Sequence, residues 1–428
     1  MKILVTGANG LIGSSICGRL VREGHQVLAV VRPGSRPPYG VANTLYLDVA
    51  AATAINTWLP VLEDIDAVVN CVGVLQESAR EDLAGAHVAG PAALFQACEQ
   101  LGGKRVVHFS AIGVDRQQPS AFSDTKLRGD DVLMARDLDW VILRPSVVLG
   151  HSAFGASALI RGLAALPVLP VMPAAAELQV VQLEDLVETV LRLLEPNAKR
   201  RVVLELVGPQ RLPFEDVVAI YRRWLGKGPA TLIRLPPVIA SLLYTLGDLA
   251  SLLSWRPALR TTAKKEIVRG ATGDPQPWAA AVGIYPRSLP EALSSTPATV
   301  QERWFSNLFF LKPLIFIVLP LFWILTGIIS LTVGFDEGMT LMNRADAGPL
   351  SAPSVIAGAL ADIVIGAMIA FRRTSRVGLW AAVLVSIFYA IAGTVLVPAL
   401  WNEPLGPLLK ILPILVLHLV ALAILEER

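Results

Sequence analysis

A glycine-rich turn near the start of the sequence has the residue types and spacing that bind a dinucleotide. It reads TGANGLIG over residues 6–13. Glycines at this spacing allow a tight turn, close approach of the backbone to a pyrophosphate, and close packing of the next helix, whose N-terminus faces the phosphates. An apolar strand at 2–6 precedes the turn and a helical pattern at 11–21 follows it, which favours a cofactor site over a purely structural turn. The residues that we expect to contact the cofactor there are Thr6, Gly7, Asn9, Gly10, Leu11, Ile12 and Gly13.

The residue after the second predicted strand bears on which dinucleotide is bound. NAD-binding domains carry an acid near this point that binds the adenosine ribose, whereas an arginine suits the 2′-phosphate of NADP. This chain has Arg32 there, directly after Val30 and Val31. The sequence therefore favours NADP over NAD. The alternative is that Arg32 is a solvated loop residue before Pro33.

The elements that must position this turn follow a regular alternation of strands and helices. Apolar, β-branched runs with helical patterns between them predict a doubly wound parallel sheet, a Rossmann fold. The predicted strands are 2–6, 26–31, 44–47, 66–70, 105–110 and 140–144. From about residue 145 the pattern is less regular and rich in proline, which indicates a smaller substrate lobe over the carboxyl ends of the strands, where ligands bind.

Length and composition divide the chain. Its length of 428 residues exceeds the usual size of a domain with one hydrophobic core. Its hydrophobic content of 54% and its mean hydropathy of +0.56 exceed those of ordinary soluble proteins. The excess lies after Trp304. We expect a Rossmann domain at 1–225, the rest of the substrate lobe and a linker (about 288–300) within 226–300, and a membrane domain at 301–428.

Charge and cysteine content exclude other classes of function. A formal net charge of +2 gives no case for nucleic-acid binding. The three cysteines lack metal-ligand spacing, so we expect no metal and reduced, buried thiols at Cys17, Cys71 and Cys98. The apolar run at 3–6 stops at Gly7 and is too short for a signal peptide, which indicates that the Rossmann domain is cytoplasmic.

Five segments make residues 1–225 resemble the atypical short-chain dehydrogenases, particularly the branch that includes the Rossmann-fold accessory subunit of respiratory complex I. They are TGANGLIG at 6–13, DV at 48–49, VVNCVG at 68–73, HFSAIG at 108–113 and LRPSVVLG at 143–150. The resemblance implies three further groups of cofactor contacts. These are Asp48 and Val49 beside the adenine, Val72 and Gly73 along the cofactor, and Pro145, Val147 and Val148 beside the nicotinamide.

The catalytic residues implied by the resemblance are incomplete. In this superfamily a tyrosine four residues before a lysine exchanges a proton with the substrate oxygen, while the lysine lowers the tyrosine pKa and binds ribose. Aligned on Lys126, the tyrosine position holds Phe122, and no tyrosine occurs between Tyr46 and Tyr221. Lys126 is still expected to bind ribose. Ser110 is expected to hydrogen-bond a substrate carbonyl, or else to cap a turn.

Three histidines are weaker candidates for a proton donor. His108 precedes Ser110 on the same strand face but closer to the core, where histidines are mostly structural. His87 lies in the helix after the fourth strand, and His151 at the entrance to the lobe. None of the three has a carboxylate partner that the sequence reveals.

Four apolar segments after residue 300 are each about long enough to cross the ~30 Å of a bilayer as a helix. They are 308–332, 354–371, 377–400 and 406–425. Their order and hydropathy resemble the DoxX-like family of four-helix membrane domains. Cationic residues gather at one side of the predicted bundle, which places both termini in the cytoplasm, at the inner membrane if the protein is bacterial. These are Arg303, Lys312, Arg372, Arg373 and Arg376, against a lone Arg344 in the first-to-second loop.

Residues 236–255 form a further apolar segment, in which Asp248 is the only charge. Basic residues follow it, so the segment could lie along the membrane surface with its cations on anionic headgroups. A core helix of the substrate lobe and a fifth span are the alternatives.

Two ionisable residues lie within the predicted spans. Asp362 and His418 fall at comparable depth, so a pair that faces the bundle interior and binds a quinone or relays protons is one hypothesis. A hydrogen-bonded pair that only fixes helix packing is the alternative.

The sequence therefore predicts a membrane-anchored, NADP(H)-binding oxidoreductase-like protein that passes reducing equivalents to a membrane or carbonyl acceptor. A non-catalytic sensor, scaffold or assembly factor is the rival, because Phe122 cannot transfer a proton. In a third hypothesis the bundle is the active part and the Rossmann domain regulates it. Whether the chain is an enzyme stays open on the sequence alone.

Overall fold

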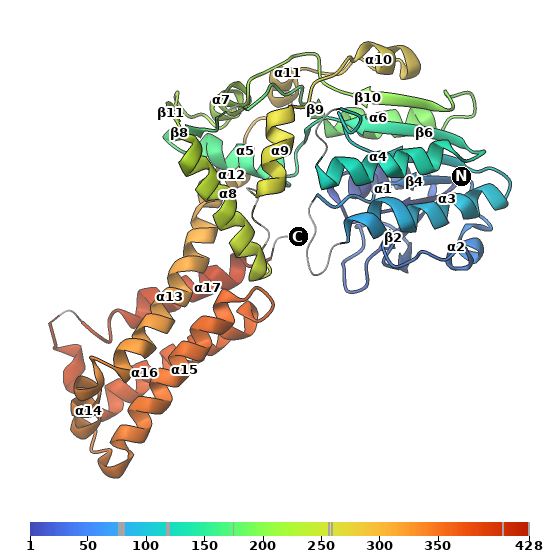
Figure 1. Ribbon diagram of the computed structural model, residues 1–428. Coiled ribbons are helices and arrows are strands. Elements are labelled where there is room, and N and C mark those ends of the chain that lie inside the picture. Colours follow the sequence, from blue (N-terminus) through green and yellow to red (C-terminus); the bar gives the residue numbers. More distant parts are fainter. Residues whose placement is uncertain are drawn as a thin grey trace. The chain divides into compact units, whose positions relative to one another are not determined.

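The computed structural model describes residues 1–75, 82–116, 120–173, 175–255, 257, 260–404 and 406–426. The chain divides into two compact units. The first comprises Met1–Leu246 and Ala258–Ser306, and the second comprises Gly247–Pro257 and Asn307–Arg428 (Figure 1). Residues 247–257 thus group with the C-terminal helices, whereas the sequence placed them with the substrate lobe.

A seven-stranded parallel sheet forms the centre of the first unit, in the order β10-β6-β5-β4-β1-β2-β3. The expected doubly wound Rossmann fold is confirmed, and the six predicted strands agree with the observed ones to within a residue. The strands are β1 (Lys2–Thr6), β2 (Gln26–Val31), β3 (Asn43–Tyr46), β4 (Ala67–Asn70), β5 (Arg105–Phe109), β6 (Asp139–Pro145) and β10 (Val202–Leu206).

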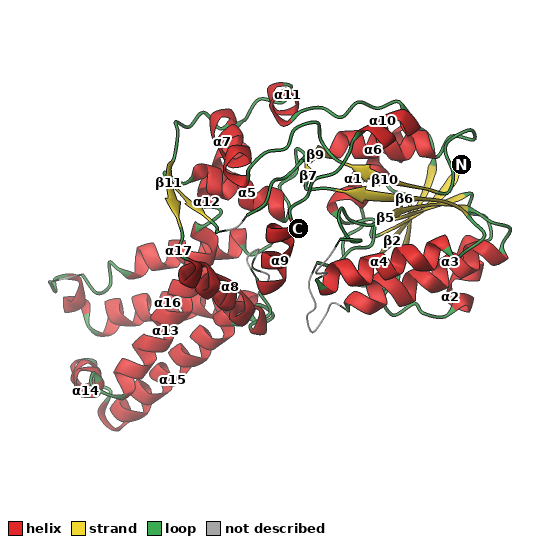
Figure 2. Cartoon of the chain, turned by 45° about the horizontal axis from the view of Figure 1, so that its top comes forward, coloured by secondary structure: helices red, strands yellow, loops and turns green. Residues whose placement is uncertain are grey.

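Helices cover both faces of this sheet, as Figure 2 shows. Alternate residues of each strand face opposite sides, so Val5 packs in one core and Leu4 in the other. The first core lies under α1 (Leu11–Arg22), α6 (Leu183–Leu193) and α10 (Gln276–Val282). The second lies under α2 (Ile55–Leu62), α3 (Gly90–Gln100) and α4 (Ala121–Met134). A π-helical segment, η1 (Gly85–Ala89), leads into α3.

The segment that the sequence predicted to be a substrate lobe is built from short strand pairs and helices. β7 (Val148–Leu149) pairs with β9 (Val181–Gln182), and β8 (Val168–Val171) pairs with β11 (Thr231–Arg234). The helices are α5 (Ala156–Ala165), α7 (Phe214–Trp224), α9 (Thr261–Arg269) and α11 (Leu289–Ser294). Helix α8 (Pro237–Leu252) begins in this unit and continues into the second unit from Gly247 on. The predicted linker therefore contains a helix, because Ser288 and Glu291 form a capping box at the start of α11.

The C-terminal unit is helical. After α12 (Val300–Leu308), which joins the two units, it contains α13 (Leu311–Leu331), α14 (Phe335–Arg344), α15 (Ser351–Ala370), α16 (Ser375–Leu396) and α17 (Ile411–Ile424). Helices α13 and α15 approach closely at two glycines: a Cβ on Gly327 would lie 2.4 Å from the Ala359 carbonyl oxygen, and one on Gly366 would lie 2.8 Å from that of Pro320. Small residues at such contacts are typical of helices packed in membranes.

Three helices within the described residues are long and apolar enough to cross a membrane: Leu311–Leu331, Gly348–Ala370 and Ser375–Leu396. The fourth predicted span is shorter than expected. Residues 407–410 form a turn after Gly406, which has a positive φ of 53°, so α17 has only 14 residues, or about 21 Å of helix. Another helix that the sequence did not predict, α14, lies between the first two spans.

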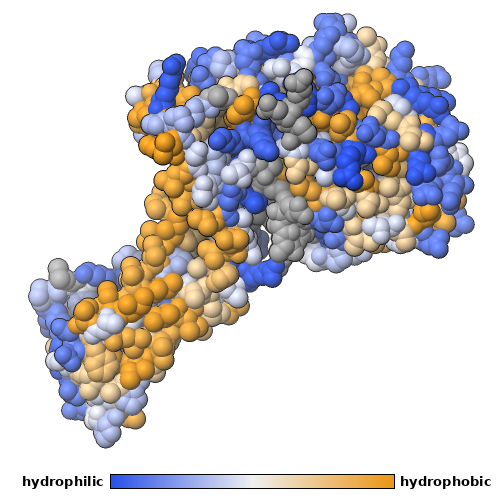
Figure 3. Space-filling view, in the orientation of Figure 1, coloured by the Kyte–Doolittle hydropathy of each residue, from blue (hydrophilic) through white to orange (hydrophobic). Residues whose placement is uncertain are grey.

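Large apolar side chains cover the outside of these helices (Figure 3). Ile317 is 56% exposed, Leu384 is 65% exposed and Val395 is 70% exposed. Contiguous apolar surfaces of this kind are rare on soluble proteins and are the usual surface of helices in lipid.

Candidate functional site

The glycine-rich turn joins β1 to α1 in a conformation that only glycine tolerates. Gly7 has a φ of +62°, and a Cβ there would lie 2.7 Å from the carbonyl oxygen of Cys71. A Cβ on Gly13 would lie 2.3 Å from the carbonyl oxygen of Gly7. Both contacts are shorter than real Cβ atoms allow, so these glycines hold α1 against the ends of β1 and β4.

The N-terminus of α1 is suited to an anion. Its N-cap residue, Gly10, has no side chain to satisfy the first helical N–H groups, and the first turn contains no acidic residue. The backbone N–H groups of Leu11, Ile12 and Gly13 therefore have no acceptor within the helix. Together with the macrodipole they favour a phosphate at this point, and the residues present thus fit a bound dinucleotide.

Thr6 differs from its neighbours in the turn. Its side chain is fully buried, and its hydroxyl donates a 2.6 Å hydrogen bond to Oδ1 of Asn70 on the neighbouring strand. The sequence predicted a cofactor contact for Thr6. The structure instead gives its side chain a supporting position behind the turn.

A cavity of about 220 Å³ lies beside the turn, at the carboxyl ends of β1, β4 and β5. It brings together residues that are far apart in the sequence, including the cofactor candidates Ile12, Val72 and Gly73 and the catalytic candidates Ser110 and Lys126. Phe122 lies in the same wall, in the position where the superfamily has its tyrosine. The full lining is Ile12, Cys71, Val72, Gly73, Leu75, Phe109, Ser110, Phe122 and Lys126.

Lys126 is held at the cavity by the main chain. Its ammonium donates to the carbonyl oxygens of Val72, at 2.9 Å, and Phe109, at 2.8 Å. An ammonium has three N–H groups, so one remains for a ligand in the cavity. Burial lowers the pKa of Lys126 from 10.5 to about 8, although Asp130 partly offsets this effect. The group can therefore lose a proton near neutral pH.

Ser110 follows β5 and is bound to a buried ion pair. Its hydroxyl donates to Oδ2 of Asp130 at 2.9 Å, and Arg144 on β6 lies 3.0 Å from the same oxygen. Asp130 is completely buried, and Arg144 also donates to Asp115 at 2.6 Å. Burial raises the pKa of Asp130, but its contacts with His108 and Arg144 hold that pKa below the ordinary value. The proton of Ser110 is thus directed away from the cavity.

His108 connects this ion pair to the glycine-rich turn. Asn70 Nδ2 lies 2.9 Å from His108 Nδ1. Because an amide nitrogen can only donate, His108 Nδ1 is the acceptor, and the proton of the neutral ring is on Nε2. His108 Nε2 lies 3.5 Å from Asp130 Oδ1. Burial lowers the pKa of His108, which keeps the ring neutral. A polar chain therefore runs from Thr6 through Asn70 and His108 to Asp130.

His87 fixes the loop that forms one wall of the cavity. Its Nε2 accepts from the backbone N–H of Val74 at 3.0 Å, and its Nδ1 lies 2.8 Å from the hydroxyl of Thr125. Burial and the nearby Lys126 lower the pKa of His87 to about 2. The ring packs edge-on against Phe122 at 5.6 Å. A neutral, fully bonded histidine of this kind is a positioning group and a poor proton donor.

The third histidine, His151, lies apart from the cavity. It is exposed, and its Nε2 is 3.8 Å from a carboxylate oxygen of Glu302. Carboxylate neighbours thus exist for both His108 and His151, and the sequence revealed neither.

The remaining predicted cofactor residues lie at the same edge of the sheet but do not line the cavity. Arg32 is exposed directly after β2. After β3, Asp48 accepts from the N–H of Ala50 at 3.1 Å, and Val49 is buried. Pro145 ends β6, Val147 bonds through its carbonyl to Val181, and Val148 begins β7. These positions follow strand ends, where the expected adenine and nicotinamide contacts would lie.

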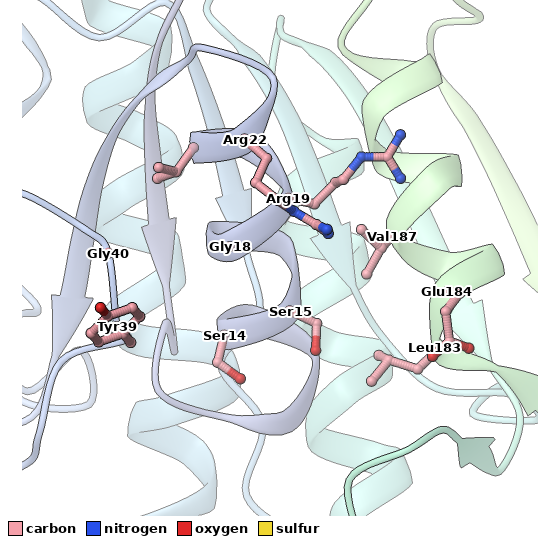
Figure 4. A pocket seen from close by; sticks show the side chains of 11 residues that line it. Ser14, Ser15, Gly18, Arg19, Arg22, Tyr39, Gly40, Leu183, Glu184 and Val187 are labelled. Carbon is pink, nitrogen blue, oxygen red and sulfur yellow. The ribbon is translucent and has the colours of Figure 1, made fainter. Parts of the chain in front are cut away.

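A larger cavity of about 560 Å³ lies elsewhere in the unit, between α1, α6 and the loop at Tyr39 (Figure 4). Arg19 and Arg22 lie on its α1 side and Glu184 on its α6 side. It contains none of the predicted cofactor or catalytic residues, so size alone does not identify the site.

Two polar pairs lie within the apolar C-terminal helices. Tyr389 on α16 donates to Oδ1 of Asp362 at 3.1 Å, and Trp323 on α13 donates to Nε2 of His418 at 2.8 Å. Asp362 and His418 are both buried, but among the described residues they are not bonded to each other. The predicted direct Asp–His pair is not seen among the described residues, because Asp362 is bonded to α16 and His418 to α13. A part for either residue in quinone binding or proton relay stays a prediction.

Comparison with known proteins agrees with both halves of this description. Residues 7–160 match the NAD(P)H-binding family model, and residues 320–419 match the DoxX-like family model. The fold is similar to that of the Bacillus cereus UDP-glucuronic acid 4-epimerase, solved with UDP-glucuronic acid and NAD. That match has a TM-score of 0.53 and 19% identity, and covers 72% of this chain and all of the epimerase.

Curated relatives are similar to the N-terminal part. An uncharacterized protein of Mycobacterium tuberculosis is 29% identical over 225 residues, 52% of this chain, and this chain spans only 23% of that protein's length. The divinyl chlorophyllide a 8-vinyl-reductase of Zea mays is 28% identical over 287 residues, 61% of this chain and 68% of the reductase. The photosystem II assembly factor Ycf39 of Guillardia theta is 24% identical over 249 residues, 55% of this chain and 74% of Ycf39.

The fold and the matched family model define an NAD(P)-binding Rossmann domain in this chain. The chain joins this Rossmann domain to a C-terminal DoxX-like domain. The expected NAD(P)-binding Rossmann domain and the expected DoxX-like domain are thereby confirmed, and a nicotinamide cofactor is supported.

Proposed function

We propose that the protein is a membrane-anchored, NADP(H)-dependent reductase in which Lys126 replaces the missing tyrosine as the proton donor. The observation that carries this proposal is the position of the Lys126 ammonium. It lies in the wall of the cavity beside the dinucleotide turn, with two N–H groups on main-chain oxygens and the third left for a ligand.

A dinucleotide and Lys126 together can supply the hydride and the proton that a reduction needs. Bound at the glycine-rich turn, NADPH would supply a hydride for the carbon of a carbonyl or another polarised double bond. Lys126 gives one proton to the oxygen, or to the atom that becomes negative, and the neutral amine then regains a proton from water. Because the lysine pKa is about 8, protonated and neutral forms are both accessible near neutral pH.

Ser110 has a different task from the one that the resemblance implied. Its proton is engaged by Asp130, so its oxygen is available as an acceptor. It would then bind a hydroxyl of the ribose or of the substrate rather than a substrate carbonyl.

The preference for NADP rests on Arg32. This residue follows β2 at the point where an acid would bind the ribose hydroxyls of NAD, and a guanidinium forms charge-assisted bonds with a phosphate. The orientation rests on the loop between α15 and α16, which contains Arg372, Arg373 and Arg376. We propose that both termini are cytoplasmic and that the helices span the membrane repeatedly, with a quinone or another membrane-dissolved acceptor as the oxidant.

A non-catalytic function is the second candidate, and Phe122 favours it. Phe122 lines the cavity where a proton-transferring hydroxyl would be. The similarity to an assembly factor shows that a related sequence serves in assembly. In this alternative, bound cofactor would stabilise a scaffold or sensor.

One set of measurements separates the two candidates. The full chain is purified in detergent, and the binding and oxidation of NADPH and NADH are measured with a soluble quinone and with carbonyl acceptors. We expect turnover that Lys126→Met abolishes while dinucleotide binding persists, with the exposed Lys264→Met as the matched control. Tight binding without turnover, and turnover gained only in Phe122→Tyr, would overturn the enzyme proposal.

A further inference from the structure

Helix α8 has its apolar side chains on the outside. Its buried positions are Ala240, Tyr244 and Gly247, spaced three and four residues apart and so on one face. Large aliphatic side chains occupy most of the remaining surface, with the exposed Ser241 and Thr245 among them. Those that are more than a third exposed are Val238, Ile239, Leu242, Leu243, Leu246, Leu249 and Leu252.

This arrangement is the reverse of a helix on a soluble domain. Such a helix turns its leucines to the core and its polar side chains to water. Exposed aliphatic patches of this extent mark a contact with another apolar phase, and the apolar surface over α8 is visible in Figure 3. The reading of 236–255 as a core helix is therefore wrong.

The segment that follows α8 is attached to the end of the membrane helices. The indole of Trp255 donates to the carbonyl oxygen of Ala370 at 2.8 Å and packs on Phe316 at 4.7 Å. The backbone N–H of Arg372 donates to the carbonyl oxygen of Leu253 at 3.0 Å, and its guanidinium lies 5.6 Å from the centre of the Trp255 ring. Tryptophan and arginine together at the end of a span are typical of the membrane interface.

Exposed cations occur in the loop that contacts this segment and in the next helix along the chain, and such cations fit lipid headgroups. The exposed Arg373 and Arg376 follow α15, and Lys264 and Lys265 are exposed on α9. Cations beside an apolar helix face attract anionic headgroups while the apolar face enters the acyl region. A helix of 16 residues is about 24 Å long, short of the ~30 Å needed to span, so it suits the interface better than the bilayer core.

We propose that α8 lies in the interface of the bilayer that the C-terminal helices cross, with its leucine-rich surface in lipid. The occupant of this surface is thus the bilayer itself rather than a protein partner. Helix α8 would be a second membrane attachment, contributed by the segment that joins the substrate lobe to the bundle.

Site-directed spin labelling of the full chain in phosphatidylcholine and phosphatidylglycerol vesicles tests this. Single cysteines are introduced by Leu242→Cys and, separately, Leu249→Cys in a Cys71→Ser background, since Cys17 and Cys98 are buried. Both leucines are exposed, so their replacement leaves the core intact. Leu384→Cys on α16 is the lipid control, and Tyr285→Cys, on a loop and 81% exposed, is the water control.

We expect both α8 labels to collide with oxygen more often than with a polar nickel complex, as the Leu384 label does. Preferential collision with nickel, as at Tyr285, would overturn the proposal by placing α8 in water. Low collision with both reagents would overturn it as well, because the surface would then be covered by protein such as a second copy of the chain.

Discussion

Ser110 Oγ lies 2.9 Å from Oδ2 of Asp130, a carboxylate that the chain buries completely and neutralises with Arg144. This relationship connects the wall of the cavity to an ion pair behind it. Because Asp130 is one helical turn after Lys126 on α4, one helix supplies both the lysine and the acid that orients Ser110.

Removal of the Asp130 charge is expected to destabilise the first unit. Asp130→Asn leaves Arg144 buried with only the exposed Asp115 as a partner, and loss of one member of a buried pair costs about 3 kcal/mol. Thermal unfolding followed by tryptophan fluorescence should show a Tm lower by several degrees. Asp131→Asn, at the next and exposed position, is the control and should leave the Tm unchanged.

The titration of Lys126 should limit turnover at high pH. If the ammonium is the proton donor, the rate falls as pH rises through about 8, where the buried lysine loses its proton. The pH dependence of kcat/KM for NADPH oxidation measures this. A rate that stays constant from pH 7 to 9.5 would remove Lys126 as the donor.

The lowered pKa of Lys126 also predicts how the stability of the folded chain depends on pH. The pKa of Lys126 is about 8 in the folded chain and 10.5 when unfolded, so between these values the unfolded state binds more protons. This lysine therefore contributes an increase in stability as pH rises from 8 to 10.5. Lys126→Met removes this titration together with the two hydrogen bonds to main-chain carbonyls, so its Tm relative to that of the natural protein should fall between pH 7 and pH 9.5. A difference in Tm that is independent of pH would contradict the lowered pKa.

A methyl group at Gly13 should abolish dinucleotide binding. The added Cβ would lie 2.3 Å from the Gly7 carbonyl oxygen and displace the turn from the helix N-terminus. We expect the Kd for NADPH to rise at least tenfold in Gly13→Ala, as measured by titration calorimetry. Gly18→Ala on the same helix is the control, because a Cβ there meets nothing within 4 Å and alanine favours a helix. Equal loss in both variants would show that helix α1, rather than the turn, was disturbed.

The two polar pairs in the membrane helices should behave independently. Asp362 is bonded to Tyr389 and His418 to Trp323, so the effects of Asp362→Asn and His418→Ala on Tm should add in the double variant. Quinone-dependent NADPH oxidation in the same variants tests whether either pair serves the acceptor. A double variant no less stable than the worse single variant would show that the two residues are coupled after all.

The sequence was sufficient to predict the sheet and the dinucleotide turn, because both depend on local patterns. Alternating apolar strands define the register, and a glycine spacing defines the turn, so the boundaries of β1 and α1 agree with those expected. The cavity was also partly predictable, since the resemblance to the short-chain dehydrogenases identified Ser110, Phe122 and Lys126, which all line it.

The polar chain behind the cavity could not be predicted in the same way. Asn70, His108 and Asp130 come from β4, β5 and α4, and only the folded sheet brings them together. One signal was available: Asp130 is four residues after Lys126, on the same helical face. The length of α17 depends likewise on a turn at 407–410 that hydropathy does not distinguish from helix.

The way Lys126 is attached has an evolutionary consequence. Its two anchors are the carbonyl oxygens of Val72 and Phe109, which every amino acid would provide equally well. Selection could therefore replace the side chains at both positions, and so change the shape and polarity of the cavity, without detaching the ammonium. A lysine that is held by main-chain atoms, in a cavity whose side chains can change, is a suitable starting point for the divergence of substrate choice within one fold.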